Sequence, residues 1–176
     1  NKPYRGWKIT LFEGGIHTPY FIRWPNKIPA GSQYDSAVAH IDVFSTALAA
    51  AGVTPPDDRV IDGVDQTALM LEGETHGRRD HVFIYSGSKL EAVVKEQYKL
   101  MPVPGPGQNP IIGKFYDLFR DTREEWPVST EIGAWGGAEF VRIIQRHKMR
   151  MVQYPDEPAA VGVPYEGIEN LRPETK

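Results

Sequence analysis

The sequence predicts an α/β fold in which a mixed N-terminal part is followed by a small antiparallel sheet with a packed helix. Three observations predict it. The first part combines a short apolar run with one amphipathic helical pattern, four β-rich runs come after it, and helical spacing returns near the C-terminus. The charged, glycine-rich stretch 72–80 is the best internal boundary. We therefore predict one unit over residues 1–80 and a second over residues 81–176.

The first unit is expected to begin with a loop and a strand. Residues 1–19 are interpreted as a loop that bends at Gly14 and Gly15, because glycine permits backbone conformations that other residues avoid. The run 20–24 is aromatic and β-branched, and Pro25 ends it. Such a run is typical of a strand buried on both faces of a sheet.

A helix is predicted to follow, from Asp42 as its N-terminal cap to Gly52 just after its last turn. Its apolar residues share one face, and they are Val43, Phe44, Ala47, Leu48 and Ala51. Because an amphipathic helix buries its apolar face, we expect this face to pack on the sheet.

The second unit should consist of strands and one helix. The β-rich runs are 81–85, 90–94, 98–101 and 114–119, and the second and third are expected to be either two strands or one strand bent around residues 95–97. The proline-rich stretch 102–110 cannot join a ladder and is predicted to be a loop. Glycines 136 and 137 are expected to open a helix over 138–152, and its apolar stripe is Phe140, Ile143, Ile144, His147 and Met151. From Pro155 onward we expect an extended tail.

Composition excludes several classes of protein. The 176 residues are 40% hydrophobic and 24% charged, which is normal for a soluble globular protein. A net charge of -3 gives no general attraction to nucleic acid, and no run reaches the roughly 18 apolar residues of a membrane-spanning helix. There is no cysteine, so the chain holds no disulfide or thiolate metal site. The N-terminal residues lack the apolar core of a signal peptide, and the start inside a motif predicts a fragment.

Lys8 is the first candidate site residue. It lies beside the glycine bend and ahead of the apolar run. A lysine ammonium is a compact cation with three donors, and it binds a sulfate or phosphate oxygen as a point charge. The alternative interpretation is a solvated surface lysine, since most lysines are exposed.

Residues 4–19 resemble a motif of the sulfatase family, in the arylsulfatases of the alkaline phosphatase superfamily. The family form is Leu-Arg-Gly-Gly-Lys-Gly-Thr-x-x-Glu-Gly-Gly-Ile-Arg-Val-Pro, and here it is Tyr-Arg-Gly-Trp-Lys-Ile-Thr-Leu-Phe-Glu-Gly-Gly-Ile-His-Thr-Pro. Further matching blocks are 21–25, 28–31, 39–46, 62–65, 98–100 and 115–124. The departures are Trp7 and Ile9 at family glycines, His17 at a family arginine and Ser45 at a family proline.

The resemblance implies a fold and a site. It implies the C-terminal end of the sulfatase core plus the smaller antiparallel subdomain of that family. Lys8 matches the family lysine that contacts the sulfate and the leaving-group oxygen, so we assign it a catalytic and substrate-binding role. Trp7 and His17 are further candidates for substrate binding. His40 and His147 are interpreted as structural.

The family's cofactors have no counterpart among these residues. Sulfatases use a calcium ion and a formylglycine made from a Cys/Ser-x-Pro/Ala-x-Arg motif, and this sequence contains no such motif. The family's metal ligands would all precede Asn1, so we assign none here. Four aspartates (57, 58, 62 and 65) lack the spacing of a calcium loop and are interpreted as turn or cap residues. We therefore expect the 176 residues alone to be inactive.

The implied reaction of the complete protein is hydrolysis of a sulfate ester. The expected partners are a sulfated small molecule or carbohydrate and the N-terminal part of the same sulfatase, with no nucleic acid. Periplasmic, secreted or lysosomal location is typical of the family. Two alternatives stay open: a phosphate or phosphonate monoester hydrolase of the same superfamily, and a non-catalytic carbohydrate-binding or interaction module.

Overall fold

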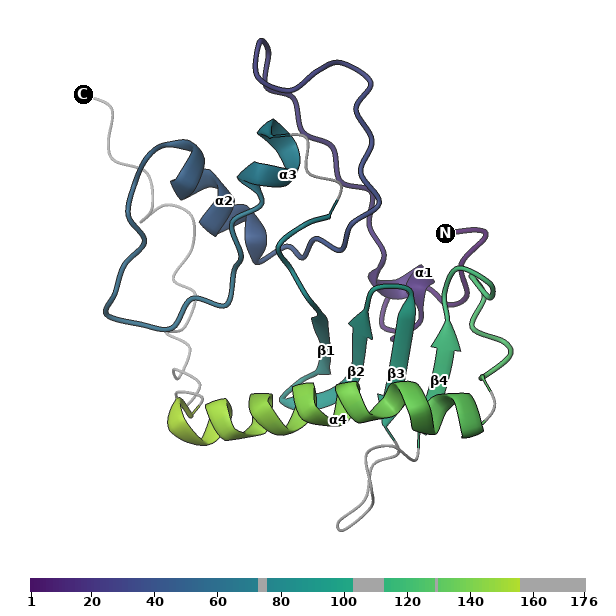
Figure 1. Ribbon diagram of the computed structural model, residues 1–176. Helices are drawn as coiled ribbons and strands as arrows, with labels where there is room; N and C mark the ends of the chain where they lie inside the picture. Colours follow the sequence, from purple (N-terminus) through teal and green to yellow (C-terminus); the bar gives the residue numbers. More distant parts are fainter. Residues whose placement is uncertain (73–75, 103–112, 129, 156–176) are drawn as a thin grey trace, which may run out of the picture.

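The structure, a computed structural model, describes residues 1–72, 76–102, 113–128 and 130–155. Its elements in chain order are α1 (Glu13–Ile16), α2 (Asp42–Ala50), α3 (Thr67–Leu71), β1 (Val82–Ser86), β2 (Lys89–Lys95), β3 (Tyr98–Pro102), β4 (Gly113–Asp117) and α4 (Thr130–Gln153). Figure 1 shows the four strands side by side, with α4 lying across them, α1 next to the upper ends of β3 and β4, and α2 and α3 above the sheet.

The strands form one antiparallel sheet in the order β1-β2-β3-β4. A strand is found at each predicted run, and the runs 90–94 and 98–101 form two strands rather than one bent strand. The loop prediction is wrong at Pro102, which ends β3 and lies opposite Gly113, and β4 ends at Asp117 rather than at residue 119. In the register of the sheet, Leu100 of β3 lies opposite Val93 on one side and Phe115 on the other. Side chains alternate between the two faces of a strand, so these three residues share one face.

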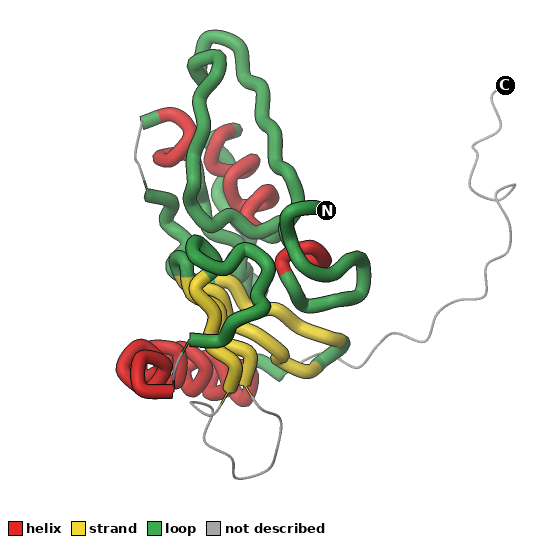
Figure 2. Tube along the Cα trace, turned by 90° about the vertical axis from the view of Figure 1, so that its right-hand side faces the viewer, coloured by secondary structure: helices red, strands yellow, loops and turns green. Residues whose placement is uncertain are grey.

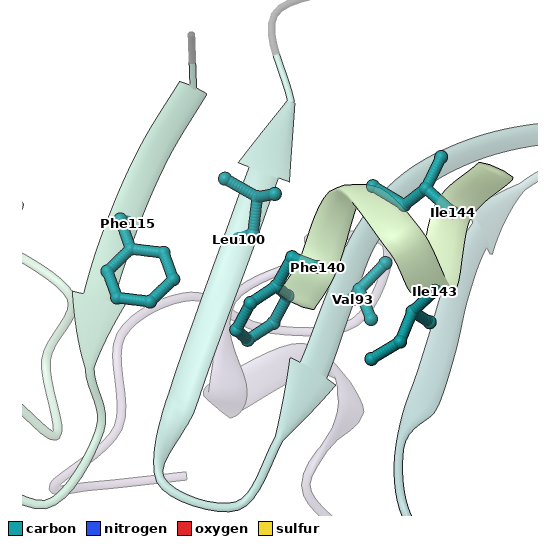
Figure 3. Packing of buried hydrophobic residues seen from close by; sticks show 6 residues of the cluster. All are labelled: Val93, Leu100, Phe115, Phe140, Ile143 and Ile144. Carbon is teal, nitrogen blue, oxygen red and sulfur yellow. The ribbon is translucent and has the colours of Figure 1, made fainter. Parts of the chain in front are cut away.

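That face packs against α4. The buried cluster consists of Val93, Leu100, Phe115, Phe140, Ile143 and Ile144, three from the sheet and three from the helix (Figure 3). The rings of Phe115 and Phe140 meet edge to face with centroids 5.3 Å apart. The apolar spacing over 140–144 therefore identified the packing face of the helix correctly.

The start of that helix is a correction. Helix α4 begins at Thr130 and contains both glycines, whereas the prediction opened a shorter helix after them. A Cβ atom at Gly136 would lie 3.3 Å from Cζ of Phe115, which is tighter than an ordinary contact. The glycine is thus used for close approach of the helix to the sheet and not for a helix end.

The second face of the sheet, opposite α4, has buried polar side chains. Lys99 and Tyr116 pair across β3 and β4, and both are almost fully buried. The N-terminal segment with α1 lies on this face, on the side opposite α4 (Figure 2). The sheet therefore packs against the apolar side of α4 on one face and against the N-terminal segment on the other.

The predicted strand at 20–24 is wrong. Residues 17–24 form neither helix nor strand, and the Phe21 side chain is 91% exposed. A strand is stabilised by pairing with a neighbour. Every described strand belongs to the four-stranded sheet, which does not include this run.

The predicted orientation of α2 is also wrong. Its buried residues are Asp42, Ser45 and Thr46, whereas Val43 and Phe44 are exposed. The Ser45 hydroxyl donates to the Gly63 carbonyl at 2.9 Å, so the helix attaches to the next segment through its polar side. The cap of this helix is Ile41 without a side-chain hydrogen bond, and Asp42 is the first helical residue.

The predicted loop, tail and domain boundary stay predictions. The predicted loop at 102–110 and the predicted tail lie almost wholly outside the described residues, and the domain boundary at 72–80 stays a prediction. No helix among the described residues has the length and apolar character to cross a membrane.

Candidate functional site

Lys8 lies at the tip of a tight turn. The Thr10 amide donates to the Trp7 carbonyl at 2.9 Å, which closes the turn. The Thr10 hydroxyl donates to the same carbonyl at 2.7 Å and accepts from the Trp7 amide at 3.0 Å. Lys8 itself is exposed and forms no hydrogen bond or ion pair with any residue that the structure describes. Its ammonium group is available to an external anion.

The paired glycines hold this turn against α1. A Cβ atom at Gly14 would lie 2.4 Å from the Arg5 carbonyl oxygen, and one at Gly15 would lie 2.1 Å from that of Thr10. The Gly14 amide also donates to the Arg5 carbonyl at 2.8 Å. Backbone packs directly on backbone here, which only glycine permits. The predicted bend is therefore a one-turn helix on which the Lys8 turn rests.

Ile9 occupies a strained position in the turn. Its φ is 85° and its side chain is 90% exposed. Positive φ is a genuine outlier for a β-branched residue. This conformation explains why the family has glycine at the position, and it shows that the departure from the motif leaves the turn intact at a cost in backbone strain.

Replacing Ile9 by glycine is expected to stabilise the chain by about 1 kcal/mol. Relief of the strain contributes about 1–3 kcal/mol, and the greater backbone entropy of glycine offsets about 0.5–1 kcal/mol of it. The measurement is urea unfolding of the 176-residue chain. Ile22→Gly is the matched control, because Ile22 is also exposed but has no positive φ. This substitution should not raise the free energy of unfolding. A lower unfolding free energy for Ile9→Gly than for the parent would contradict the strain argument.

A buried group of charges lies behind the turn. The Lys99 side chain is fully buried, and its Nζ lies 2.8 Å from Glu124 Oε1, 3.2 Å from Glu13 Oε1 and 2.6 Å from the Leu11 carbonyl oxygen. Glu124 Oε2 accepts from the Glu13 amide at 2.6 Å. Arg5 donates to the Glu124 backbone carbonyl at 2.8 Å. We refer to Lys99, Glu13 and Glu124 as the Lys99 cluster.

Sequence reasoning assigned no role to the Lys99 cluster. The available signal was a lysine inside a β-rich run whose neighbours are apolar. A charge at such a place needs a buried partner. The partners themselves could not be located, since Glu13 and Glu124 are far from Lys99 in the chain.

The other predicted site residues differ in their surroundings. The Trp7 side chain is 71% exposed and belongs to the same turn as Lys8. His17 follows α1, where its Nδ1 lies 3.2 Å from Glu13 Oε2 and its ring stacks on Tyr4 at 4.7 Å. Within the described part of the chain, no hydrogen bond or ring contact joins His17 to the turn. The site roles of Lys8, Trp7 and His17 stay predictions.

Two further histidines have structural surroundings. His40 lies 3.4 Å from the Thr18 hydroxyl. His147 stacks on Phe83 at 3.9 Å and shares a hydrogen bond with the Tyr85 hydroxyl. Burial lowers the pKa of His147 below its ordinary value, because the charged imidazolium loses hydration there.

The aspartates make local contacts. Asp65 accepts from the Thr67 amide at 2.8 Å at the start of α3, and Asp58 pairs with Arg59 at 2.6 Å. Among the residues that the structure describes, no three carboxylate or imidazole groups come together as metal ligands would. We assign no residue of this chain to a calcium ion.

The fold and the motif define the C-terminal region of a sulfatase, and comparison with known proteins agrees. Residues 5–129 match the family model described as N-sulphoglucosamine sulphohydrolase, C-terminal. The chain therefore belongs to this family. The matched region contains the Lys8 turn and all three residues of the Lys99 cluster.

Relatives and solved structures extend the comparison. The chain is 43% identical over 99 residues to N-acetylgalactosamine-6-sulfatase of Canis lupus familiaris, covering 56% of this chain and 19% of that protein. It is 31% identical over 158 residues to steryl-sulfatase of Rattus norvegicus, covering 74% of this chain and 27% of that protein. The chain thus spans about a fifth to a quarter of the length of these relatives.

A solved structure shows the same fold. The crystal structure of the PsFucS1 sulfatase from Pseudoalteromonas sp. superimposes with a TM-score of 0.78 at 26% identity, over 89% of this chain and 34% of that one. The predicted fold class, the C-terminal end of a sulfatase core with a small antiparallel sheet and a packed helix, is confirmed.

Proposed function

We propose that this chain is the C-terminal part of an enzyme that hydrolyses sulfate esters, and that Lys8 contacts the sulfate group. The observation that carries the proposal is the Lys8 turn: an exposed ammonium with no counter-charge among the described residues, at the tip of a loop fixed by glycine packing and buried ions. Membership of a sulfatase family supports the same reaction.

The chemistry that follows is electrostatic. When the S–O bond of a sulfate ester breaks, negative charge develops on the leaving oxygen. A fixed cation stabilises that charge more than it stabilises the bound substrate, so it lowers the barrier. Lys8 can also donate a hydrogen bond to the sulfate oxygens. The calcium ion and formylglycine implied by the family would supply further charge stabilisation and the nucleophile, and no described residue here is assigned to either.

We further propose a sulfated carbohydrate as the substrate class. The exposed Trp7 indole beside Lys8 supports it, because an aromatic ring offers a broad apolar face and an N–H donor next to the cation. His17, half exposed at the end of α1, is the second proposed contact. The name of the dog relative, N-acetylgalactosamine-6-sulfatase, supports a sulfated sugar in this family.

The proposed partner of the chain is the N-terminal part of the same sulfatase. Many large apolar side chains between residues 20 and 60 are exposed: Tyr20, Phe21, Ile22, Tyr34, Val38, Ile41, Val43, Phe44, Val53 and Val60. Exposed apolar surface on this scale is typical of a contact surface. Burial by the rest of the enzyme would account for both the outward face of α2 and the unpaired run at 20–24.

The test is turnover by the complete protein that carries this chain. We expect it to hydrolyse 4-nitrophenyl sulfate faster than 4-nitrophenyl phosphate, and the 176-residue chain alone, the matched control, to hydrolyse neither. Faster hydrolysis of the phosphate would favour the phosphomonoesterase alternative. Retention on a sulfated polysaccharide without any turnover would favour the binding module.

A further inference from the structure

The Lys99 cluster consists of three charged side chains in the interior of the molecule, where apolar side chains are more usual. Lys99 and Glu124 are fully buried, and Glu13 is nearly so. Taking such charges out of water costs several kcal/mol per ion, and buried ion pairs are often no more stabilising than apolar residues of the same size. Stability alone is therefore a weak explanation for the cluster.

The position of the cluster suggests a different explanation. Lys99 belongs to the middle of the sheet, and its side chain points to the face opposite α4. Its ammonium reaches the Leu11 carbonyl and the Glu13 carboxylate, which lie just after the Lys8 turn. A rigid strand thus contacts the C-terminal end of the turn directly.

Glu124 contacts both ends of the same turn. Its carboxylate accepts from the Glu13 amide at 2.6 Å, and its backbone carbonyl accepts from the Arg5 guanidinium at 2.8 Å. Arg5 precedes the turn and Glu13 follows it. The residues from 5 to 13 are consequently held at both ends by partners that are not part of the loop.

We propose that Lys99 and Glu124 are positioning residues that fix the Lys8 turn for reaction. This inference rests on the proposed function of Lys8. The ion pair between them is the rigid base, and Glu13 and Arg5 transmit its position to the turn. Reactions of this kind are sensitive to placement, because a shift of about 1 Å can cost about 100-fold in rate.

The first test is Lys99→Met in the complete protein. Methionine keeps most of the length and the apolar contacts of the stem but leaves two buried carboxylates without a cation. We expect kcat per folded molecule to fall by about 10- to 100-fold, with KM changed much less. Amide hydrogen exchange should rise over residues 5–17 and stay low over residues 89–95.

The control and rescue variants separate positioning from general destabilisation. Lys89→Met removes a lysine from the same sheet whose ion pair with Glu91 is exposed, and it should leave kcat and exchange unchanged. Adding Glu124→Gln to Lys99→Met removes one of the two uncompensated carboxylates but keeps an acceptor for the Glu13 amide. This double variant should recover part of the lost kcat.

A milder variant covers the case in which Lys99→Met does not fold. Arg5 has an exposed side chain, so Arg5→Met should fold and still release one end of the turn. It should lower kcat several-fold and raise exchange over residues 5–17. Parental kcat and parental exchange in both variants would overturn the inference.

If the proposed function of Lys8 is wrong, a different set of results is expected. If Lys8→Ala in the complete protein retained parental kcat, the proposed role of Lys8 would be wrong. The exchange comparison would then still decide whether Lys99 and Glu124 hold the turn, because holding the turn is a property of the chain and does not depend on catalysis.

Discussion

Replacing Lys8 by alanine in the complete protein is expected to lower kcat by about 100- to 1,000-fold, the usual effect of removing one preorganised group that stabilises developing charge. The structure gives this lysine no internal partner among the described residues, so the substitution disturbs no contact of the fold. Stability and the exposed turn should therefore be unchanged. A loss in kcat larger than the change in KM would indicate that Lys8 acts mainly in the transition state.

Lys27→Ala is the matched control for this experiment. Lys27 is also an exposed lysine in a turn, but it lies outside the anchored loop. Its replacement should leave kcat and KM at parental values. A parental kcat for Lys8→Ala, or an equal loss in both variants, would show that the motif lysine has no particular role.

Local sequence signals were sufficient for the sheet and its helix contacts. Each of the strands β1 to β4 is a short run that contains aromatic or β-branched residues, and such runs favour a strand through their own pattern. The apolar spacing of Phe140, Ile143 and Ile144 likewise encodes its packing face. The start of α4 could not be predicted from such a pattern. Gly136 lies inside the helix because the helix approaches Phe115 of β4 closely there, and the sequence does not show this contact.

The candidate site was predictable only in part. The family motif located Lys8, and the glycine pair located the bend, but neither locates Lys99 or Glu124. Those two residues matter because the fold brings them to the loop from more than 80 residues away, as the separations of 86 residues for Glu13–Lys99 and 111 for Glu13–Glu124 show. Patterns in a single sequence do not show which residues so far apart in the chain are in contact.

The prediction of the orientation of α2 failed for a related reason. Its apolar residues lie on one face, and a pattern argument buries that face by default. In the structure the opposite face is buried, because Asp42 and Thr46 bond to the segment that leads into α3. The sequence places an aspartate at the start of this helix, but it shows neither that the side chain is buried nor that its partner is Arg79.

The ion pair between Arg79 and Asp42 holds α2 in this orientation. The Arg79 Nε donates to Asp42 Oδ2 at 2.7 Å, and a second guanidinium nitrogen pairs with Oδ1. Asp42 is 1% exposed, and Arg79 also donates to the Asp62 and His81 carbonyls. The pair therefore joins α2 to the backbone at residue 62 and at residue 81, just before β1.

Arg79→Met is expected to destabilise the chain by about 3–5 kcal/mol, because it leaves the Asp42 carboxylate buried without its cation. Urea unfolding at neutral pH is the measurement. Arg59→Met is the control, since Arg59 pairs with Asp58 at the surface and its loss should leave the unfolding midpoint unchanged. Equal midpoints for the parent and Arg79→Met would contradict the assigned role of the pair.

The pH dependence of this loss follows from the carboxyl group. Burial opposes ionisation of Asp42, but hydrogen bonds from Arg79 and from the Ala39 and Val64 amides outweigh it and hold the pKa below its ordinary value of 3.8. The stability that Asp42 contributes in the parent is thus present above pH 3.8 and is lost only as the pH falls through the lower folded value.

Without Arg79, burial has fewer opposing contacts, so the pKa of Asp42 should rise. The variant can then relieve its buried charge by taking up a proton at mildly acidic pH. We expect the difference in unfolding free energy between parent and variant to be largest at neutral pH and to shrink as the pH is lowered. Adding Asp42→Asn to Arg79→Met should remove the part of this pH dependence that lies above pH 3.8, because the variant then has no ionisable group at the position. A difference that is constant with pH would mean that Arg79 acts through packing and its backbone hydrogen bonds, and not through the charge of Asp42.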